Sequence, residues 1–555
     1  MADLTDRTPK TLHTPSRRAL LVGGAASVAA FALAPSASAS TTSARQAPAF
    51  LRSTGPSAVR SLESATVRTW AADTWRSLVA MTNPHTGLPA DNIPESLAPG
   101  DRSGYTSPTN IGGYLWSTIA ARELGIISRG EATARLIRTL KTLYRMEHHV
   151  PSGMYYNWYD EETGKALTSW PGSGDKVYAF ASSVDNGWLG AALLVVANSD
   201  RAAGPWARRI FDRMRWKAFY NDNSDPAHQV RAGGLVHGGF YPYEDGRPGG
   251  TYLGTHIGGE PVWLTTHHYD TTVSETRITT YLGIITGQIN PTAYYATWRT
   301  FPDTCDWSWQ EMKPVGVTRR YYGLDVYEGA YTYRGLHIVP GWGGSMFEEL
   351  MPDVFVDEAA WAPRSWGRNH PLHVRAQREH GLVDADYGYW GFSPSSNPAG
   401  GYREYGVDPL GLGPGNEPGN GANGYFSDQE MTNYDVGFDG CRAATNPTPT
   451  YGDGVVTPHA SFLAMMHEPD QAFTNLANIQ ADFDAYDRGG FFDAVAVRSG
   501  MVARRYLSLD QAMVMGAIGN VLGNDVIRRG FSTAAVERAL KPVIGIEEFG
   551  ASPIA

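Results

Sequence analysis

The sequence predicts an all-α fold, a single toroid of helical hairpins with long loops and small β insertions. Apolar residues recur at helical spacing along most of the chain, whereas strand-like runs are few and short. Long segments rich in Gly, Pro and Tyr separate the helical stretches, mainly at 221–273 and 386–456. Residues 40–60 are rich in Ser, Ala, Thr and Pro and predict a flexible linker. No abrupt change in composition follows, so we expect one domain over 61–555.

The expected helices have recognisable first turns. Ser128, Ser182 and Ser508 are each followed three residues later by an acidic or amide side chain, a pattern typical of a capped helix start. Apolar faces then predict helices over 111–124, 128–144, 182–196, 205–219, 274–285, 458–466, 471–479, 508–522 and 533–540. Short strands are expected at 315–322 and 336–339.

The first 39 residues have the features of an export signal. Arg17 and Arg18 precede an apolar run from Ala19 to Leu33, and an A-x-A stretch ends at Ala39. This order is typical of a cleavable secretory signal, and the paired arginines indicate twin-arginine export. The alternative is a membrane anchor, but the run of 15 residues is short of the roughly 20 that a spanning helix needs. We therefore expect residues 1–39 to be removed and the protein to be secreted.

The charge of the chain limits its partners. The whole sequence has a formal net charge of −10, and residues 1–39 carry four basic and two acidic side chains. Without them the net charge would be −12. An acidic protein binds nucleic acid, anionic lipid or polyuronic acids poorly, because the like charges repel. We expect no nucleic-acid partner, no membrane contact after the signal is removed, and a monomer.

Aromatic side chains are abundant and point to a carbohydrate partner. They make up 12% of the chain, with 16 Trp and 29 Tyr, and many stand beside Gly, Asn, Asp or Pro, as in 155–160 and 387–392. Flat rings with polar tips suit a cleft that stacks sugar faces and hydrogen-bonds their hydroxyls. The alternative is ordinary packing of long loops. We expect an oligo- or polysaccharide to contact Tyr156, Trp158, Trp188, Trp342 and Trp390.

No motif indicates a cofactor or a metal ion. Walker A, HExxH, GxSxG and Cys/His zinc spacings are absent, and the Gly-rich stretch 411–424 lacks the strand–turn–helix setting of a nucleotide site. We therefore expect neither a cofactor nor a metal. Cys305 and Cys441 are too few for a disulfide scaffold, and the sequence leaves open whether they form one bridge or remain thiols.

Asp185 is a candidate catalytic carboxylate. If Ser182 caps the helix, Asp185 is its third residue, where the helix dipole favours a negative charge. That placement can be purely structural. It also keeps the carboxylate ionised, as a general base or water-orienting group requires. We expect the next residues, Asn186, Gly187 and Trp188, to line the same site.

Glu275 is the second candidate. It stands just before the apolar stripe of the helix 274–285 and projects near that stripe. A carboxyl beside apolar surface has its proton stabilised, as a general acid needs. The alternatives are a plain helix-start acid and a partner for Arg277.

Other carboxylates lie in Gly-rich aromatic segments. Glu348 belongs to 341–352 and Glu404 to 401–406, while Asp160 follows the aromatic run that includes Trp158. Such residues are more often loop anchors or acceptors for sugar hydroxyls than catalysts. We expect all three near the bound sugar.

Six segments in order resemble the glucoamylase-like domain found in bacterial endo-β-1,2-glucanases and in the C-terminal region of cyclic β-1,2-glucan synthases. The segments are 156–160, 182–187, 274–277, 343–348, 390–393 and 454–460. The resemblance extends from about residue 70 to 540. It implies an (α/α)6 barrel and glycoside hydrolase or transglycosylase chemistry.

The resemblance also assigns roles to residues. Glu275 falls on the glutamate of the family's T-E-x-R motif, with Ser274 in place of threonine, and Asp185 falls on the aspartate of V-D-x-G. The synthases have a glutamate in W-G-I-S-E-S, where this chain has Pro394. The resemblance therefore implies the hydrolytic branch and, without a second carboxylate close to Glu275, an inverting mechanism.

The sequence thus predicts a secreted glycoside hydrolase that cleaves a neutral glycan, with β-1,2-glucan as the best candidate. Glu275 and Asp185 would form the acid/base pair, and which is the acid stays open. One alternative is a polysaccharide lyase on the same toroid, using a pair such as Tyr269 and His268. The other is a glycan-binding protein without catalysis.

Overall fold

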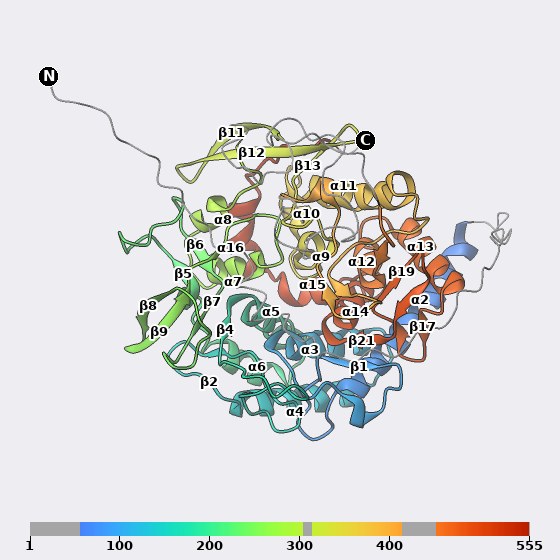
Figure 1. Cartoon of the computed structure of the whole chain (residues 1–555), viewed down its shortest axis with the longest axis horizontal. Helices are drawn as coiled ribbons and strands as arrows, with labels where there is room; N and C mark the ends of the chain where they lie inside the picture. The colour runs from blue at the N-terminus through green and yellow to red at the C-terminus, as the bar shows by residue number, and fades with distance from the viewer. Residues whose placement is uncertain (1–55, 303–312, 413–450, 554–555) are drawn as a thin grey trace.

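A computed structural model describes residues 56–302, 313–412 and 451–553 of the chain. The export signal, Cys305 and Cys441 lie outside these residues, as does most of the predicted linker. Helix α2 (Pro56–Met81) begins before residue 60, so the end of the predicted linker is helical. The described chain is mostly helical with many small sheets, as the composition and spacing predicted (Figure 1).

Six helices contact one another in succession around the centre of the view in Figure 1. They are α3 (Pro108–Glu123), α5 (Ser183–Ser199), α7 (Arg277–Ile285), α9 (Met346–Leu350), α12 (Pro458–Ala464) and α14 (Ser508–Leu522). Helix α3 packs against α5 and α14, α5 against α7, and α12 against both α9 and α14. Arg277 of α7 donates to carbonyls of α9 and completes the succession.

Each of these helices has a further helix packed against it. The pairs are α3 with α4 (Arg129–Arg145), α5 with α6 (Gly204–Phe211), α7 with α16 (Ala534–Ile544), α9 with α11 (Trp366–Glu379), α12 with α13 (Pro469–Asp482) and α14 with α2. Short helices α8 (Thr292–Ala296), α10 (Glu358–Trp361) and α15 (Val526–Phe531) fill remaining positions, and α15 packs against α3, α5 and α14.

The strands are short, antiparallel and scattered between the helices. The largest sheet has the order β4 (Ala181–Ser182), β7 (Gly239–Tyr241), β9 (Glu260–Thr265), β8 (Tyr252–Ile257). Three-stranded sheets join β11 (Val315–Tyr321), β12 (Leu324–Tyr333) and β13 (Leu336–Ile338); β10 (His268–Tyr269), β6 (Leu235–His237) and β5 (Tyr220–Asn221); and β16 (Val455–Val456), β19 (Ala494–Ala496) and β20 (Met501–Ala503). Pairs join β1 (Asn92–Pro94) to β21 (Arg505–Leu507), β2 (His148–His149) to β3 (Met154–Tyr155), β14 (Ser395–Ser396) to β15 (Tyr402–Arg403), and β17 (Tyr486–Asp487) to β18 (Gly490–Phe491).

Several predicted helix boundaries need correction. Ser128 and Ser182 accept hydrogen bonds as capping residues, but Leu507 is the N-cap of α14 and Ser508 makes no cap bond. The predicted helix over 205–219 is divided into α6 and a 3₁₀ turn at Trp216–Phe219. Helix α7 begins at Arg277, so Glu275 lies in the turn before the helix and not within it.

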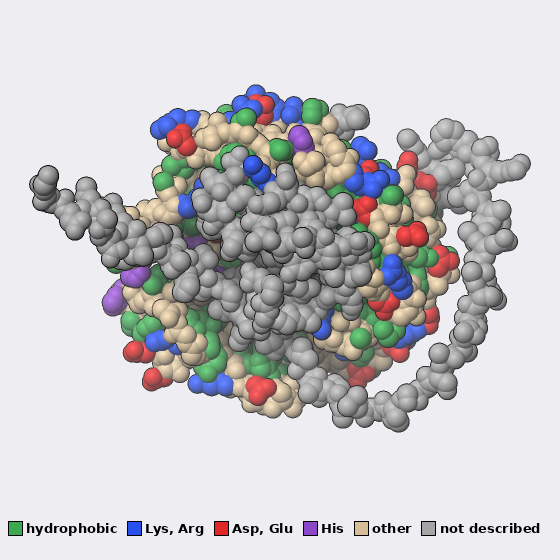
Figure 2. Space-filling view, turned by 45° about the horizontal axis from the view of Figure 1, so that its top comes forward, with side chains coloured by type: hydrophobic (Ala, Val, Ile, Leu, Met, Phe, Trp, Pro, Cys, Tyr) green, Lys and Arg blue, Asp and Glu red, His purple; other side chains and the backbone are tan. Residues whose placement is uncertain are grey.

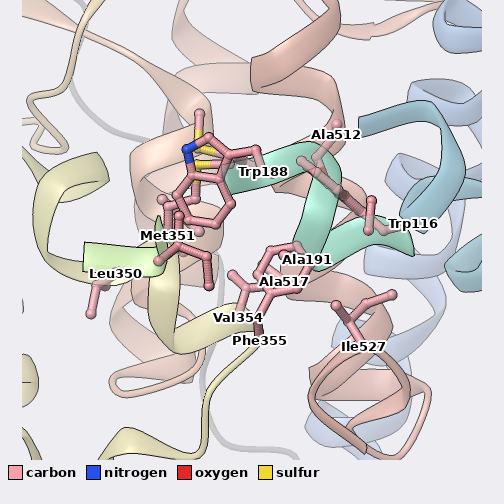
Figure 3. Packing of buried hydrophobic residues seen from close by; sticks show 14 of the residues in the cluster. Trp116, Trp188, Ala191, Leu350, Met351, Val354, Phe355, Ala512, Ala517 and Ile527 are labelled. Carbon is pink, nitrogen blue, oxygen red and sulfur yellow. The ribbon is translucent and has the colours of Figure 1, made fainter. Parts of the chain in front are cut away.

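Large apolar side chains pack together between α3, α5, α9, α14 and α15 (Figure 3). The ring of Phe355 lies 5.1 Å from the ring of Trp116 and 5.6 Å from that of Trp188. Burying aromatic rings of this size supplies most of the favourable free energy of a core. None of the described helices is both long and apolar enough to cross a membrane.

Candidate functional site

Direct contacts join the first turns of α3 to α5, of α5 to α7, and of α12 to α14. Thr109 of α3 donates to Asp185 of α5 at 2.7 Å, and Thr279 of α7 donates to the carbonyl of Ser183 at the start of α5. His459 of α12 lies 3.2 Å from the carboxylate of Asp510 in α14.

Two loop segments complete these connections. The side chain of Asn110 in α3 donates to Asp91, whose carbonyl accepts from Ser508 at the start of α14. Residues 391–393 accept from the first backbone amides of α9 and from Thr457, the N-cap of α12. The N-terminal ends of the helices therefore meet at one site, where their dipoles favour negative charge.

Asp185 is placed there as the sequence predicted. The half-buried side chain is the third residue of α5, and its backbone amide donates to the cap hydroxyl of Ser182 at 3.2 Å. Its Oδ1 accepts from Thr109. The carboxylate is thus oriented by a neighbouring helix as well as by its own.

Glu275 is half-buried in the turn that leads into α7. The hydroxyl of Ser274 donates to its Oε2 at 3.3 Å. Because α5 and α7 are in contact through Ser183 and Thr279, the turn of Glu275 lies at the same end of the helices as Asp185. The structure brings the two predicted catalytic residues to one end of the fold.

Glu348 is a structural anchor. It is buried, and its Oε2 accepts from the amides of Gly343 and Ser345 and from the hydroxyl of Ser345, within a capping box. These bonds fix the loop before α9. The carboxylate supports the site by holding this loop, which is a different role from the sugar contact that the sequence predicted.

A pair of buried aspartates, which the sequence analysis did not single out, lies beside α12 and α14. Burial and the neighbouring Asp510 raise the pKa of Asp493 well above its usual range, and burial raises the pKa of Asp510 to about 7. Two adjacent carboxyls in a buried site share a proton, because both cannot be charged. A small pocket adjoins them, lined by residues that include His459, Phe462, Phe491, Phe492, Asp493 and Asp510.

Tyr402 faces this pair from β15. Its side chain keeps 37% of its surface exposed. Burial among neighbouring atoms and the carboxylates of Asp510, Asp493 and Glu404 raise the pKa of its phenol. The half-buried Glu404 also acts on the phenol of Tyr402.

The aromatic residues named from the sequence divide into core and site-facing positions. Trp188 and Trp390 are 1% and 2% exposed and belong to the main core, so the expectation that they line subsites is wrong. Tyr156 is also buried. Trp158 packs against Tyr105 and Trp170 in a separate small cluster.

The remaining predicted site residues are partly accessible. Trp342 is half-buried against a cluster that includes Phe301 and Tyr331. Asp160 accepts from the amides of Glu162 and Thr163 and so closes its own loop. His268 and Tyr269 form β10, where burial and two neighbouring histidines lower the pKa of His268 to about 2.

One buried cluster has the residue types of a metal site. Ligand atoms of Asp353, Glu358 and His370 lie within 4.8 Å of one another. However, Arg528 pairs with Asp353 and Arg277 with Glu358. Burial alone would lower the pKa of His370, but the surrounding carboxylates raise it to about 10. The two arginines already pair with carboxylates of the cluster, so the described side chains form a network of opposite charges.

Two family models match the chain. Residues 267–534 match the family described as Putative glucoamylase, and residues 69–246 match a family described as a protein of unknown function, DUF3131. Among curated proteins, 136 residues are 35% identical to the cyclic β-(1,2)-glucan synthase NdvB of Rhizobium meliloti. That match covers 24% of this chain and only 4% of the relative's length.

Solved structures share the fold. A β-1,2-glucanase from Parabacteroides distasonis has a TM-score of 0.60 at 16% identity, over 87% of this chain and 60% of that chain. An endo-β-1,2-glucanase from Chitinophaga pinensis, described in complex with sophorotriose and glucose, has a TM-score of 0.56 at 16% identity, over 87% and 98% of the two chains. At this identity the likeness shows the fold alone.

Proposed function

We propose that this chain, whose residues 267–534 belong to the family described as Putative glucoamylase, is a glycoside hydrolase that acts on a neutral glycan. The observation that carries the proposal is the meeting of carboxylates at the joined N-terminal ends of six helices. A glycoside hydrolase needs two carboxyl groups, one to protonate the leaving oxygen and one to activate water or attack carbon.

The six helices in succession, each with a second helix packed against it, support the proposal of an (α/α)6 barrel. In such a barrel the site lies where the first turns of the central helices meet. Sugar rings would enter from that end and meet Asp185, Glu275, Glu404 and Tyr402.

Glu275 and Asp185 are the proposed acid/base pair. The contact between α5 and α7 brings their helix starts together, and Ser274 and Thr109 orient the two carboxyl groups. Asp493 is a second candidate for the acid, because burial and the neighbouring Asp510 raise its pKa, which favours the protonated form. Replacing each carboxyl separately distinguishes the two assignments.

The proposed stereochemistry is inversion. Pro394 occupies the place of the synthase-type glutamate, and the backbone amide of Ser396 beyond it donates to Asp493. Inversion requires carboxyls roughly 6.5–9.5 Å apart, with a water between the sugar and the base. Proton NMR of the first-formed anomer tests this, since a product with the substrate's anomeric configuration would reject inversion.

β-1,2-Glucan is the proposed substrate, because two relatives of the same fold are described as β-1,2-glucanases and one of them as bound to sophorotriose. The test is a panel of neutral and acidic glycans with product analysis. Release of β-1,2-linked oligosaccharides supports the proposal. Unsaturated products that absorb in the ultraviolet would support a lyase instead, and binding without products would support a glycan-binding protein.

A further inference from the structure

We infer that Arg277 and Glu358 form a positioning pair, which holds the turn bearing Glu275 against α9. The inference deepens the proposed function and rests on it, because it assigns a purpose to the turn of a proposed catalytic residue. Neither residue touches the sugar in this assignment.

The guanidinium of Arg277 uses every donor it has. Its Nε and Nη2 donate to the two carboxylate oxygens of Glu358, both at 2.8 Å. Nη2 also donates to the carbonyl of Glu349 at 2.6 Å, and Nη1 donates to the carbonyls of Glu348 at 2.8 Å and Ser274 at 3.0 Å. Five N–H groups meet five acceptors, which fixes both the position and the plane of the group.

Arg277 and one of its acceptors, Ser274, flank Glu275 in the chain. Ser274 precedes it and Arg277 follows two residues later, so the guanidinium closes the turn on both sides of the glutamate. The bonds to Glu348 and Glu349 use carbonyls of the short helix α9 that have few partners within the helix. Arg277 therefore fixes the turn relative to α9 and to the loop that Glu348 anchors.

Glu358 is also fixed by several neighbouring side chains. It is fully buried, it accepts from the hydroxyl of Tyr281 at 2.7 Å, and its Oε2 lies 3.3 Å from the Nε2 of His370. The indole of Trp366 lies 4.2 Å from the guanidinium of Arg277. A buried ion pair adds little net stability over apolar residues of the same size, because both charges lose their hydration. We therefore assign the Arg277–Glu358 ion pair a different role, which is to fix the geometry of the turn that carries Glu275.

The chain contains a matched pair elsewhere. Arg299 and Glu547 are also fully buried, and the Nε of Arg299 donates to Glu547 at 2.7 Å. This second pair lies beside β12 and joins the segment after α8 to residues beyond α16. It bears no carboxylate of the proposed site, so it serves as a control for the general cost of breaking a buried Arg–Glu pair.

The experiment compares Glu358→Gln with Glu547→Gln in the full chain. For each variant we measure the melting temperature, kcat and KM on β-1,2-glucan, and amide hydrogen exchange of the peptide that spans 274–279, which excludes the residues bonded to Thr297 and Trp298. Glu358→Gln should lower kcat at least about tenfold with little change in KM, because a displaced catalytic group loses rate and not ground-state binding. It should also speed exchange in that peptide. Glu547→Gln should lower the melting temperature with kcat nearly unchanged.

Equal kcat for the two variants at similar melting temperatures, with equal exchange at 274–279, would overturn the inference. If Glu358→Gln does not fold, Tyr281→Phe removes only one hydrogen bond to Glu358 and should still lower kcat more than Glu547→Gln does. If the wild type cleaves no glycan, the proposed function fails. The exchange measurement then still decides whether the pair holds the turn.

Discussion

The carboxyl groups at the joined helix ends differ in what surrounds each of them. Asp185 lies at a helix start and accepts a hydrogen bond from a threonine hydroxyl. Glu348 accepts three hydrogen bonds from Gly343 and Ser345 and so anchors their loop. Asp493 and Asp510 share a buried site and therefore a proton. Residues of the same type thus serve as an oriented carboxylate, an anchor and a protonated acid, depending on burial and partners.

Replacing either proposed catalytic carboxyl should remove most of the turnover. Glu275→Gln and Asp185→Asn are each expected to lower kcat by at least about a hundredfold, the scale of losing general acid–base help. Both changes nearly preserve shape, so the variants should fold. Steady-state kinetics on the substrate found by the glycan panel, with melting temperatures as the control, give the answer. A folded Glu275→Gln variant with near-normal kcat would exclude Glu275 and favour Asp493 as the acid.

Asp510 should make the stability of the protein depend on pH. Its pKa is about 7 in the folded protein against 3.8 in the reference state, so the folded state binds more protons between these values. Stability from this group is therefore present below about pH 4 and is lost as the pH rises towards 7. The free energy of unfolding of Asp510→Asn, relative to wild type, should rise across pH 4 to 8. A pH-independent difference in denaturant titrations would contradict this.

Two of the central helices approach so closely that only glycine fits between them. A Cβ on Gly187 of α5 would lie 2.3 Å from the hydroxyl of Thr279 and 3.1 Å from a methyl group of Ile278, both in α7. The hydroxyl of Thr279 itself bonds to α5. The close spacing of the helix ends that carry Asp185 and Glu275 therefore depends on Gly187.

Gly187→Ala should separate α5 from α7. We expect a loss of about 1–3 kcal/mol in the free energy of unfolding, as for other overpacked sites, together with a fall in kcat. Gly130→Ala is the control, since Gly130 lies in α4 with only one atom near the added Cβ, at 4.0 Å. That variant should gain up to about 1 kcal/mol in stability and keep its kcat. A Gly187→Ala variant as stable and active as Gly130→Ala would refute the close approach.

Helices α3, α4, α5, α12, α13 and α14 overlap predicted elements because their apolar spacing and first-turn residues are local signals. Helix α11 was missed for a physical reason. Its buried face carries Asn369, His370, His373 and Gln377, and it contains Pro371, so its sequence has no apolar stripe. The acceptors and donors that satisfy these side chains, such as Glu349 for His370, come from other elements. No local pattern could reveal them.

Over the whole molecule, acidic and basic side chains are mixed on the face shown in Figure 2. The formal net charge of the chain is −10, which suits a neutral glycan better than a polyanion. Export by the twin-arginine route would deliver such a protein folded to the outside of the cell. This remains a proposal that rests on residues 1–39.

Export should remove the first segment of the chain near Ala39. N-terminal sequencing of the protein recovered from culture medium should therefore begin close to residue 40, while an Arg17→Lys, Arg18→Lys double variant should stay inside the cell. The variant keeps the positive charge and so tests the paired arginines specifically. Recovery of extracellular protein that still begins at Met1 would reject the cleavage.

The sequence by itself determined the mostly helical fold, the capped start of α5 with Asp185 in its first turn, and the match of residues 267–534 to the family described as Putative glucoamylase. These follow from spacing and short motifs, which are local. Only the tertiary structure decided that Trp188 and Trp390 are core residues, that Glu348 is an anchor, and that Asp493 and Asp510 share a proton. Burial and partnership depend on residues distant in the chain. Asp493 lies 17 residues before Asp510 in the chain, and the two come together because Thr457, the N-cap of α12, donates to the carbonyl of Asp493 while α14 packs against α12.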